Sequence, residues 1–193
     1  SNPIRFFTFN IMFHEYTLFG LVKDQANPEL VQILSAMTDS EPRPLVQHVS
    51  YLRKSKNNSY IQLIEHVDEW NPSESRSIVR FIEPLANKGI VFHQHVTQSL
   101  VKSNNAIPFF SLYSSYETDS RFNLRGYYFY FPSGIRIDVA FIYVASNDET
   151  VYNGRTVTLS GVSADIEDDN VVTEIENIQR SLSSFIAWKE HPQ

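Results

Sequence analysis

The stretch LRGYYFYFPSGIRIDVAFIYV, residues 124–144, decides the fold class of this chain. Two runs rich in aromatic and β-branched residues lie on either side of residues 132–134, a proline, a serine and a glycine. Proline followed closely by glycine is typical of a tight turn, and the flanking residues favour extended structure. We therefore predict a β-hairpin with strands at Leu124–Phe131 and Ile135–Ala145.

The first strand of this hairpin also resembles an RNA-recognition strand, which has a basic residue, a glycine and then alternating aromatic residues. Residues 125–127 and Phe129 fit that pattern. Tyr128, however, occupies the position that requires Gly or Ala, and Pro132 replaces the last aromatic residue. We expect the rings to be hairpin residues on two faces, with Tyr127, Phe129 and Phe131 on one and Tyr128 and Tyr130 on the other. An RNA-binding module stays open as an alternative.

Other strands are predicted at 13–22, 45–54, 60–70, 77–83, 90–101 and 155–163, mostly joined by short turns. Asn27 is expected to cap a first helix that begins at Pro28 and stops before the prolines of residues 41–44. Asp168 or Asp169 is expected to cap a last helix that runs to about Ala187, and residues 105–113 are a candidate for another short helix. The predicted fold class is α+β, mainly an antiparallel β-barrel of about eight strands with two or three flanking helices.

The composition excludes some functions and disfavours others. The chain has 193 residues, 22 acidic against 16 basic residues and a net charge of −6, which opposes nucleic-acid binding because such binding depends on neutralising phosphates. It has no cysteine, so disulfides, thiolate nucleophiles and cysteine zinc sites are excluded. No apolar run approaches the ~20 residues of a membrane helix, and we expect no membrane contact. We found no internal repeat or linker and predict a single domain over residues 1–193.

Three groups of polar residues were considered as sites. His93 and His95 share one strand face and could hold a metal with a third ligand such as His66, although hydrogen-bonded histidines are the simpler interpretation. Glu174 and Glu176 are expected on a helix, about 200° apart, as a solvated face. Arg136 and Asp138 share the second face of the hairpin and are expected to form an ion pair. We therefore predict no catalytic residues, no metal ligands, no cofactor and no enzyme activity.

The order of several segments resembles one protein family. The first segment contains Tyr16, Leu18 and Gly20 ahead of an expected helix and reads FHEYTLFGLVKDQANPELVQILSAMTD. The segments that follow it, in order, are RPLVQHVSYLRKS, SIVRFIEPLANKGIVFHQHV, the 124–144 hairpin and VTLSGVSADIEDDN with a terminal helix. This order is similar to that of the Mediator subunit 18 family, fungal type, from about Met12 to Pro192. Residues 1–11 depart from the family pattern, and we expect them to be an N-terminal extension or an added segment before a start at Met12.

The resemblance implies a noncatalytic scaffold and adaptor subunit of the Mediator head module, a nuclear coactivator of RNA polymerase II transcription. It implies binding to subunit 20 and to a C-terminal helix of subunit 8, with the polymerase machinery contacted indirectly and nucleic acid not contacted directly. The barrel is also similar to that of fungal RNA triphosphatases, which carry Glu-x-Glu on strands facing a tunnel. The first strand here offers only Glu15, so the metal-dependent RNA triphosphatase is the disfavoured alternative.

A scaffold acts through its surfaces. The aromatic density of one short connection exceeds what a connection requires, and we predict partner binding there, unless these side chains cover the end of the core instead. The residues are Phe109, Phe110, Leu112 and Tyr113.

Overall fold

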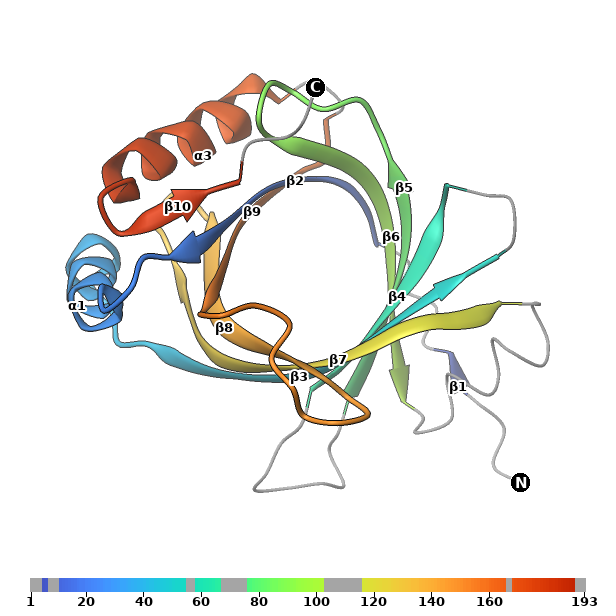
Figure 1. Cartoon of the computed structure of the whole chain (residues 1–193). Helices are drawn as coiled ribbons and strands as arrows, with labels where there is room; N and C mark the ends of the chain where they lie inside the picture. Colours follow the sequence, from blue (N-terminus) through green and yellow to red (C-terminus); the bar gives the residue numbers. More distant parts are fainter. Residues whose placement is uncertain are drawn as a thin grey trace.

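The structure, a computed structural model, describes residues 5–6, 11–54, 58–66, 76–102, 116–165 and 168–189. Strands form a ring, and the two described helices lie on the outside of that ring (Figure 1). The helices are α1, Asn27–Thr38, and α3, Asp169–Leu182. The strands are β1 Arg5–Phe6, β2 Ile11–Val22, β3 Arg43–Arg53, β4 Tyr60–His66, β5 Arg76–Pro84, β6 Phe92–Lys102, β7 Glu117–Tyr130, β8 Arg136–Val144, β9 Thr156–Ser163 and β10 Ile186–Trp188.

Eight of the strands close an antiparallel barrel, as the sequence predicted. Their order is β6-β5-β4-β3-β7-β8-β9-β2, and pairing between β2 and β6 completes the ring. The closing strand β2 pairs with β6 through residues 11–17 and with β10 through residues 20–22. The short β1 pairs with residues 101–102 of β6, beyond the part that β2 covers. The two short strands therefore extend the β2–β6 seam at its opposite ends.

The predicted β7–β8 hairpin is confirmed. Tyr130 lies opposite Arg136, and the backbone amide of Phe131 donates to the carbonyl of Ile135 at 2.8 Å. Gly134 closes the turn with φ of 89°, a left-handed conformation that glycine adopts without steric cost. Strand β7 begins earlier than predicted, at Glu117, because it pairs along the whole of β3.

The start of α1 differs from the prediction. Asn27 is the first helical residue, and the N-cap residue is Ala26, which makes no side-chain capping hydrogen bond. The side-chain oxygen Oδ1 of Asn27 instead accepts a hydrogen bond from the Tyr127 hydroxyl of β7, at 2.8 Å. A tertiary contact therefore replaces the local cap. The helix ends as expected before the prolines, with Asp39 in a left-handed conformation.

The start of α3 was predicted correctly, and its end was not. Asp168 is the N-cap, and its carboxylate accepts hydrogen bonds from the amides of Asn170 and Val171. The helix stops at Leu182, five residues before the predicted end. Residues 186–188 form β10 because they find open backbone groups on β2 next to the region that β6 occupies. None of the described helices has the length and apolar character needed to cross a membrane.

The main core lies outside the barrel wall, between the strands and the two helices. Leu18 of β2, Phe129 of β7 and Leu159 of β9 are buried there with Leu34 of α1 and Ile175 of α3. A second outer cluster lies over β3–β6 and comprises Leu52, Ile61, Leu63, Val79 and Val101. Since neighbouring residues of a strand point to opposite faces, the residues between these positions point into the barrel.

The aromatic run of β7 obeys the same alternation, as predicted. Tyr127 and Phe129 belong to the outer core, with their rings 5.8 Å apart and almost perpendicular. Tyr128 and Tyr130 point inward, and both rings lie beside the guanidinium of Arg136. The rings are therefore structural contacts on both faces of the strand.

Candidate functional site

The inner face of the barrel carries a buried ion pair between two strands that are not neighbours. Arg80 of β5 lies 2.6 Å from the Oε2 atom of Glu15 of β2, and each side chain is 12% exposed. Gln94 donates to the other carboxylate oxygen of Glu15 at 2.6 Å, and Arg80 donates to Gln62 at 2.7 Å. A four-residue polar network therefore spans β4, β5, β6 and β2. Tyr51 extends it, because Gln62 donates to its hydroxyl at 3.3 Å.

A second interior ion pair joins Arg136 and Asp138 of β8, as the sequence predicted. The Nε atom of Arg136 lies 2.5 Å from Asp138 Oδ1. Burial raises the pKa of the Asp138 carboxyl, although the attraction of Arg136 acts in the opposite direction. Burial opposes the charge of Arg136, but Asp138 and the Tyr130 hydroxyl outweigh it and raise the pKa of the guanidinium. The two interior carboxylates that we identify in the described barrel are thus each engaged by an arginine.

The two histidines considered as metal ligands lie on the outer face of β6. His93 is buried, and its Nε2 atom lies 2.9 Å from Nδ1 of His14 on β2. The ring of His95 lies 5.3 Å from that of His14. The side chain of His66, the suggested third ligand, lies outside the described part. His93 is therefore hydrogen-bonded to His14 and not to His95, and the described residues contain no group of three or more side chains arranged to hold a metal.

Burial, helped by neighbouring charges, disfavours protonation of the pair formed by His14 and His93. Desolvation lowers the pKa of His14, and His95 lowers it further, while the carboxylate of Asp165 acts in the opposite direction. Desolvation also lowers the pKa of His93, with smaller contributions from His14 and Lys88. The sequence did not reveal this pair because His14 is 79 residues away from His93 in the chain.

The remaining sequence candidates do not form a site in the described residues. Glu174 and Glu176 lie on α3, as expected, with Glu174 exposed and Glu176 partly buried. The predicted partner-binding residues Phe109, Phe110, Leu112 and Tyr113 lie outside the described residues, so partner binding there stays a prediction.

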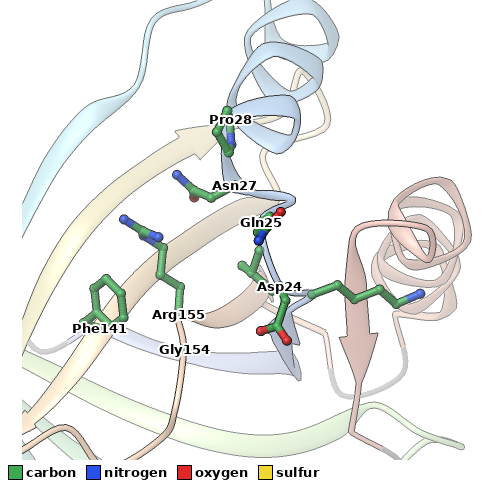
Figure 2. Close-up of a pocket in the computed structure, with 9 residues that line it drawn as sticks. Asp24, Gln25, Asn27, Pro28, Phe141, Gly154 and Arg155 are labelled. Carbon is green, nitrogen blue, oxygen red and sulfur yellow. The ribbon is translucent and has the colours of Figure 1, made fainter.

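The structure adds a pocket that the sequence did not indicate. A cavity of about 470 Å³ lies between the connection from β2 to α1 on one side and the outer face of β8 and the residues just before β9 on the other. Asp24, Asn27 and Pro28 line one side of it, and Phe141 and Arg155 line the other. Figure 2 shows the Arg155 side chain extending toward Asn27, with Phe141 beside it. Segments more than 100 residues apart form this pocket, so no local pattern could have predicted it.

Comparison with known proteins identifies the fold. No family model and no curated protein sequence matches this chain. Among solved structures, a chain of the Mediator head module of Schizosaccharomyces pombe superposes with a TM-score of 0.69 and 15% identity, covering 91% of this chain and 98% of that chain. This chain shares the fold of a Mediator head subunit. The resemblance stated from the sequence is therefore confirmed at the level of the fold.

Other proteins share the same barrel. A protein of Pyrococcus horikoshii OT3 matches with a TM-score of 0.61 and 12% identity, covering 92% of this chain and 94% of that chain. The triphosphatase of the Mimivirus capping enzyme matches with a TM-score of 0.60 and 8% identity, covering 91% of each chain. The fold alone is thus compatible with both functions weighed from the sequence, and the choice between them depends on side chains.

Proposed function

We propose that this protein is a noncatalytic scaffold and adaptor subunit of the Mediator head module and acts in the nucleus in RNA polymerase II transcription. The fold it shares with a chain of the Schizosaccharomyces pombe head module supports this proposal. So does the inner face of the barrel, where Glu15 and Asp138 are each paired with an arginine. Metal-assisted phosphoryl transfer calls for carboxylates that converge on a metal, and these two serve as ion-pair partners instead.

The proposed partners are subunit 20 and a C-terminal helix of subunit 8. Co-expression of the full chain with both partners is expected to give a ternary complex that elutes as one species in size-exclusion chromatography. The matched control omits the subunit 8 helix and is expected to give a less stable complex. A chain that elutes as a free monomer in the presence of both partners would contradict the proposal.

The triphosphatase neighbour and the interior arginines define the competing function. It predicts release of the γ-phosphate from triphosphate-ended RNA or ATP in the presence of Mg²⁺ or Mn²⁺. We expect no release above a buffer control. Activity that disappears in the Glu15→Gln variant would establish the enzyme and overturn the scaffold proposal, because it would place the chemistry inside the barrel.

A further inference from the structure

The pocket beside α1 contains a positive charge, Arg155, that forms no ion pair with any residue the structure describes. The guanidinium carbon of Arg155 lies 4.5 Å from the centre of the Phe141 ring. Among the described residues, ion pairs form at Arg53, Arg80, Lys88 and Arg136, and none forms at Arg155. The charge of Arg155 also acts on the neighbouring Tyr127 hydroxyl. Burial raises the pKa of Tyr127 to about 12, and Arg155 opposes this shift. Within the described part of the chain, Arg155 therefore presents its charge to the pocket without a paired carboxylate.

A second arginine extends this arrangement along the outer face of the barrel, from β8 to β7. Arg125 of β7 lies directly opposite Phe141 of β8, and its guanidinium carbon is 5.6 Å from the centre of the Tyr143 ring. Arg125 is exposed and also forms no ion pair within the described part of the chain. Residues Arg125, Phe141, Tyr143 and Arg155 thus form a continuous surface of two cations and two rings, which we call the Arg–aromatic strip.

The charge of the strip is opposite to that of the whole molecule. The chain has a net charge of −6. Despite this surplus of acidic residues, neither arginine of the strip forms an ion pair with a described residue. Guanidinium groups bind carboxylates in a preferred planar geometry, and rings beside them cover apolar side chains. The strip therefore complements a ligand that carries both carboxylates and apolar groups.

The geometry also favours a peptide over a nucleic acid. Asp24 lines the pocket, and the turn with Asp148 and Glu149 is hydrogen-bonded to Val144 at the end of β8. Carboxylates in the pocket and in the turn that follows β8 would repel a continuous phosphate backbone, whereas a peptide can place acidic residues only where the arginines lie. Arg125 and Arg155 are two strands apart, roughly 10 Å, which matches about three residues of extended peptide.

We propose that the pocket and the Arg–aromatic strip bind an acidic peptide segment of a partner protein. One carboxylate pairs with Arg155 in the pocket, a second pairs with Arg125, and the apolar residues between them lie against Phe141 and Tyr143. This inference rests on the proposed adaptor role and deepens it, because it specifies the chemistry of one partner.

The test uses the full chain and two labelled peptides in fluorescence anisotropy. The first peptide has twelve residues, with Asp at every third position and Leu and Phe between them, and the second has Asn in place of each Asp. We expect the acidic peptide to bind and Arg155→Gln to weaken binding at least about tenfold, as for loss of a charge-assisted hydrogen bond. Arg125→Gln is expected to weaken it less, because Arg125 is more exposed.

Arg180→Gln is the matched control, since it removes an equal charge from the exposed surface of α3. It is expected to leave binding unchanged, and thermal unfolding followed by circular dichroism shows whether each variant is folded. Equal binding of the two peptides, or equal effects of Arg155→Gln and Arg180→Gln, would overturn the inference. So would tighter binding of a 20-nucleotide single-stranded RNA that is lost in Arg155→Gln, which would assign the strip to nucleic acid.

Co-expression with subunits 20 and 8 separates this inference from the proposed function. A ternary complex without binding of the acidic peptide overturns only the inference. Absence of the complex overturns the proposed function, and the anisotropy result then decides by itself whether the strip binds an acidic peptide.

Discussion

In strand β9, Leu159 points outward into the core beneath α3, while its neighbour Thr158 points into the barrel. Leu159 is fully buried among apolar side chains, and Thr158 lies opposite Asp138 of the inner ion pair. The main core lies on the outer face of the sheet, whereas the inner face carries the two ion pairs together with buried apolar residues such as Ile82 and Val96. The two faces therefore differ in chemistry, because the ion-pair networks lie on the inner face, while the outer face packs apolar side chains against the helices.

The largest effect is expected from substitutions at these two neighbouring positions. Leu159→Ala removes a fully buried side chain from the outer core and should lower the free energy of unfolding by about 4 kcal/mol. Thr158→Ala should change it by less than about 0.5 kcal/mol, because Thr158 is only partly buried. Equilibrium unfolding in urea measures both. Similar losses in the two variants would contradict the assignment of the main core to the outer face.

The interior ion pair gives the next largest effect. Glu15→Gln leaves the guanidinium of Arg80 buried without its carboxylate and should cost about 2–3 kcal/mol of unfolding free energy. In the double variant Glu15→Leu with Arg80→Met, no unpaired charge remains, so the loss should be smaller than in Glu15→Gln. A double variant that is less stable than Glu15→Gln would show that the pair itself stabilises the barrel.

A close contact between helix and sheet gives a smaller effect. A Cβ atom on Gly161 of β9 would lie 2.5 Å from Ile135 Cδ1 and 2.6 Å from Val171 Cγ1. These are side-chain ends that can move, so Gly161→Ala should cost about 1–2 kcal/mol as a case of overpacking. The additional substitution Val171→Ala should restore part of this loss. Urea unfolding of the three variants tests this, and a Gly161→Ala variant as stable as the original chain would argue against close packing of α3 on β9.

How far the sequence predicted this structure depends on whether the determining contacts are local. The β7–β8 hairpin and the Asp168 cap were predicted because turn residues and capping residues act within a few positions. Ile186 and Ala187 were wrongly predicted as helix, because their strand state is set by pairing with β2, far away in the chain. Asn27 was wrongly predicted as a cap, because its side-chain oxygen accepts a hydrogen bond from Tyr127, which is far away in the chain.

The candidate sites follow the same rule. The Arg136–Asp138 pair was predicted because the two residues are two positions apart on one strand. The His14–His93 pair and the pocket at Arg155 depend on closure of the ring and on the position of α1, which a single sequence does not specify. Strand alternation would have placed His14 and His93 on one face only if the register between β2 and β6 had been known.

The buried histidine pair gives a dependence of stability on pH. The pKa values of His14 and His93 are lowered in the folded state, so the unfolded chain binds more protons as the pH falls through the ordinary value of 6.5. Stability should therefore be highest above that pH and decrease below it. In the native chain the His93 ring stacks on Tyr16, with the ring centres 4.5 Å apart. His93→Phe keeps a ring at this position but removes a titratable group, so stability should decrease less steeply below that pH. Melting temperatures between pH 5 and 8 test this, and equal slopes for both proteins would contradict it.

The smallest effect is expected at two adjacent tyrosines, which again lie on the two faces. Tyr127→Phe removes the hydrogen bond to Asn27 that anchors the start of α1 and should cost about 1 kcal/mol. Tyr128→Phe keeps the ring that faces Arg136, 4.0 Å from the guanidinium carbon, and should change stability by less than about 0.5 kcal/mol. Both variants lose one hydroxyl from one strand, so urea unfolding compares the two faces directly. A larger loss in Tyr128→Phe would mean that polar contacts of the interior contribute more to stability than the attachment of α1.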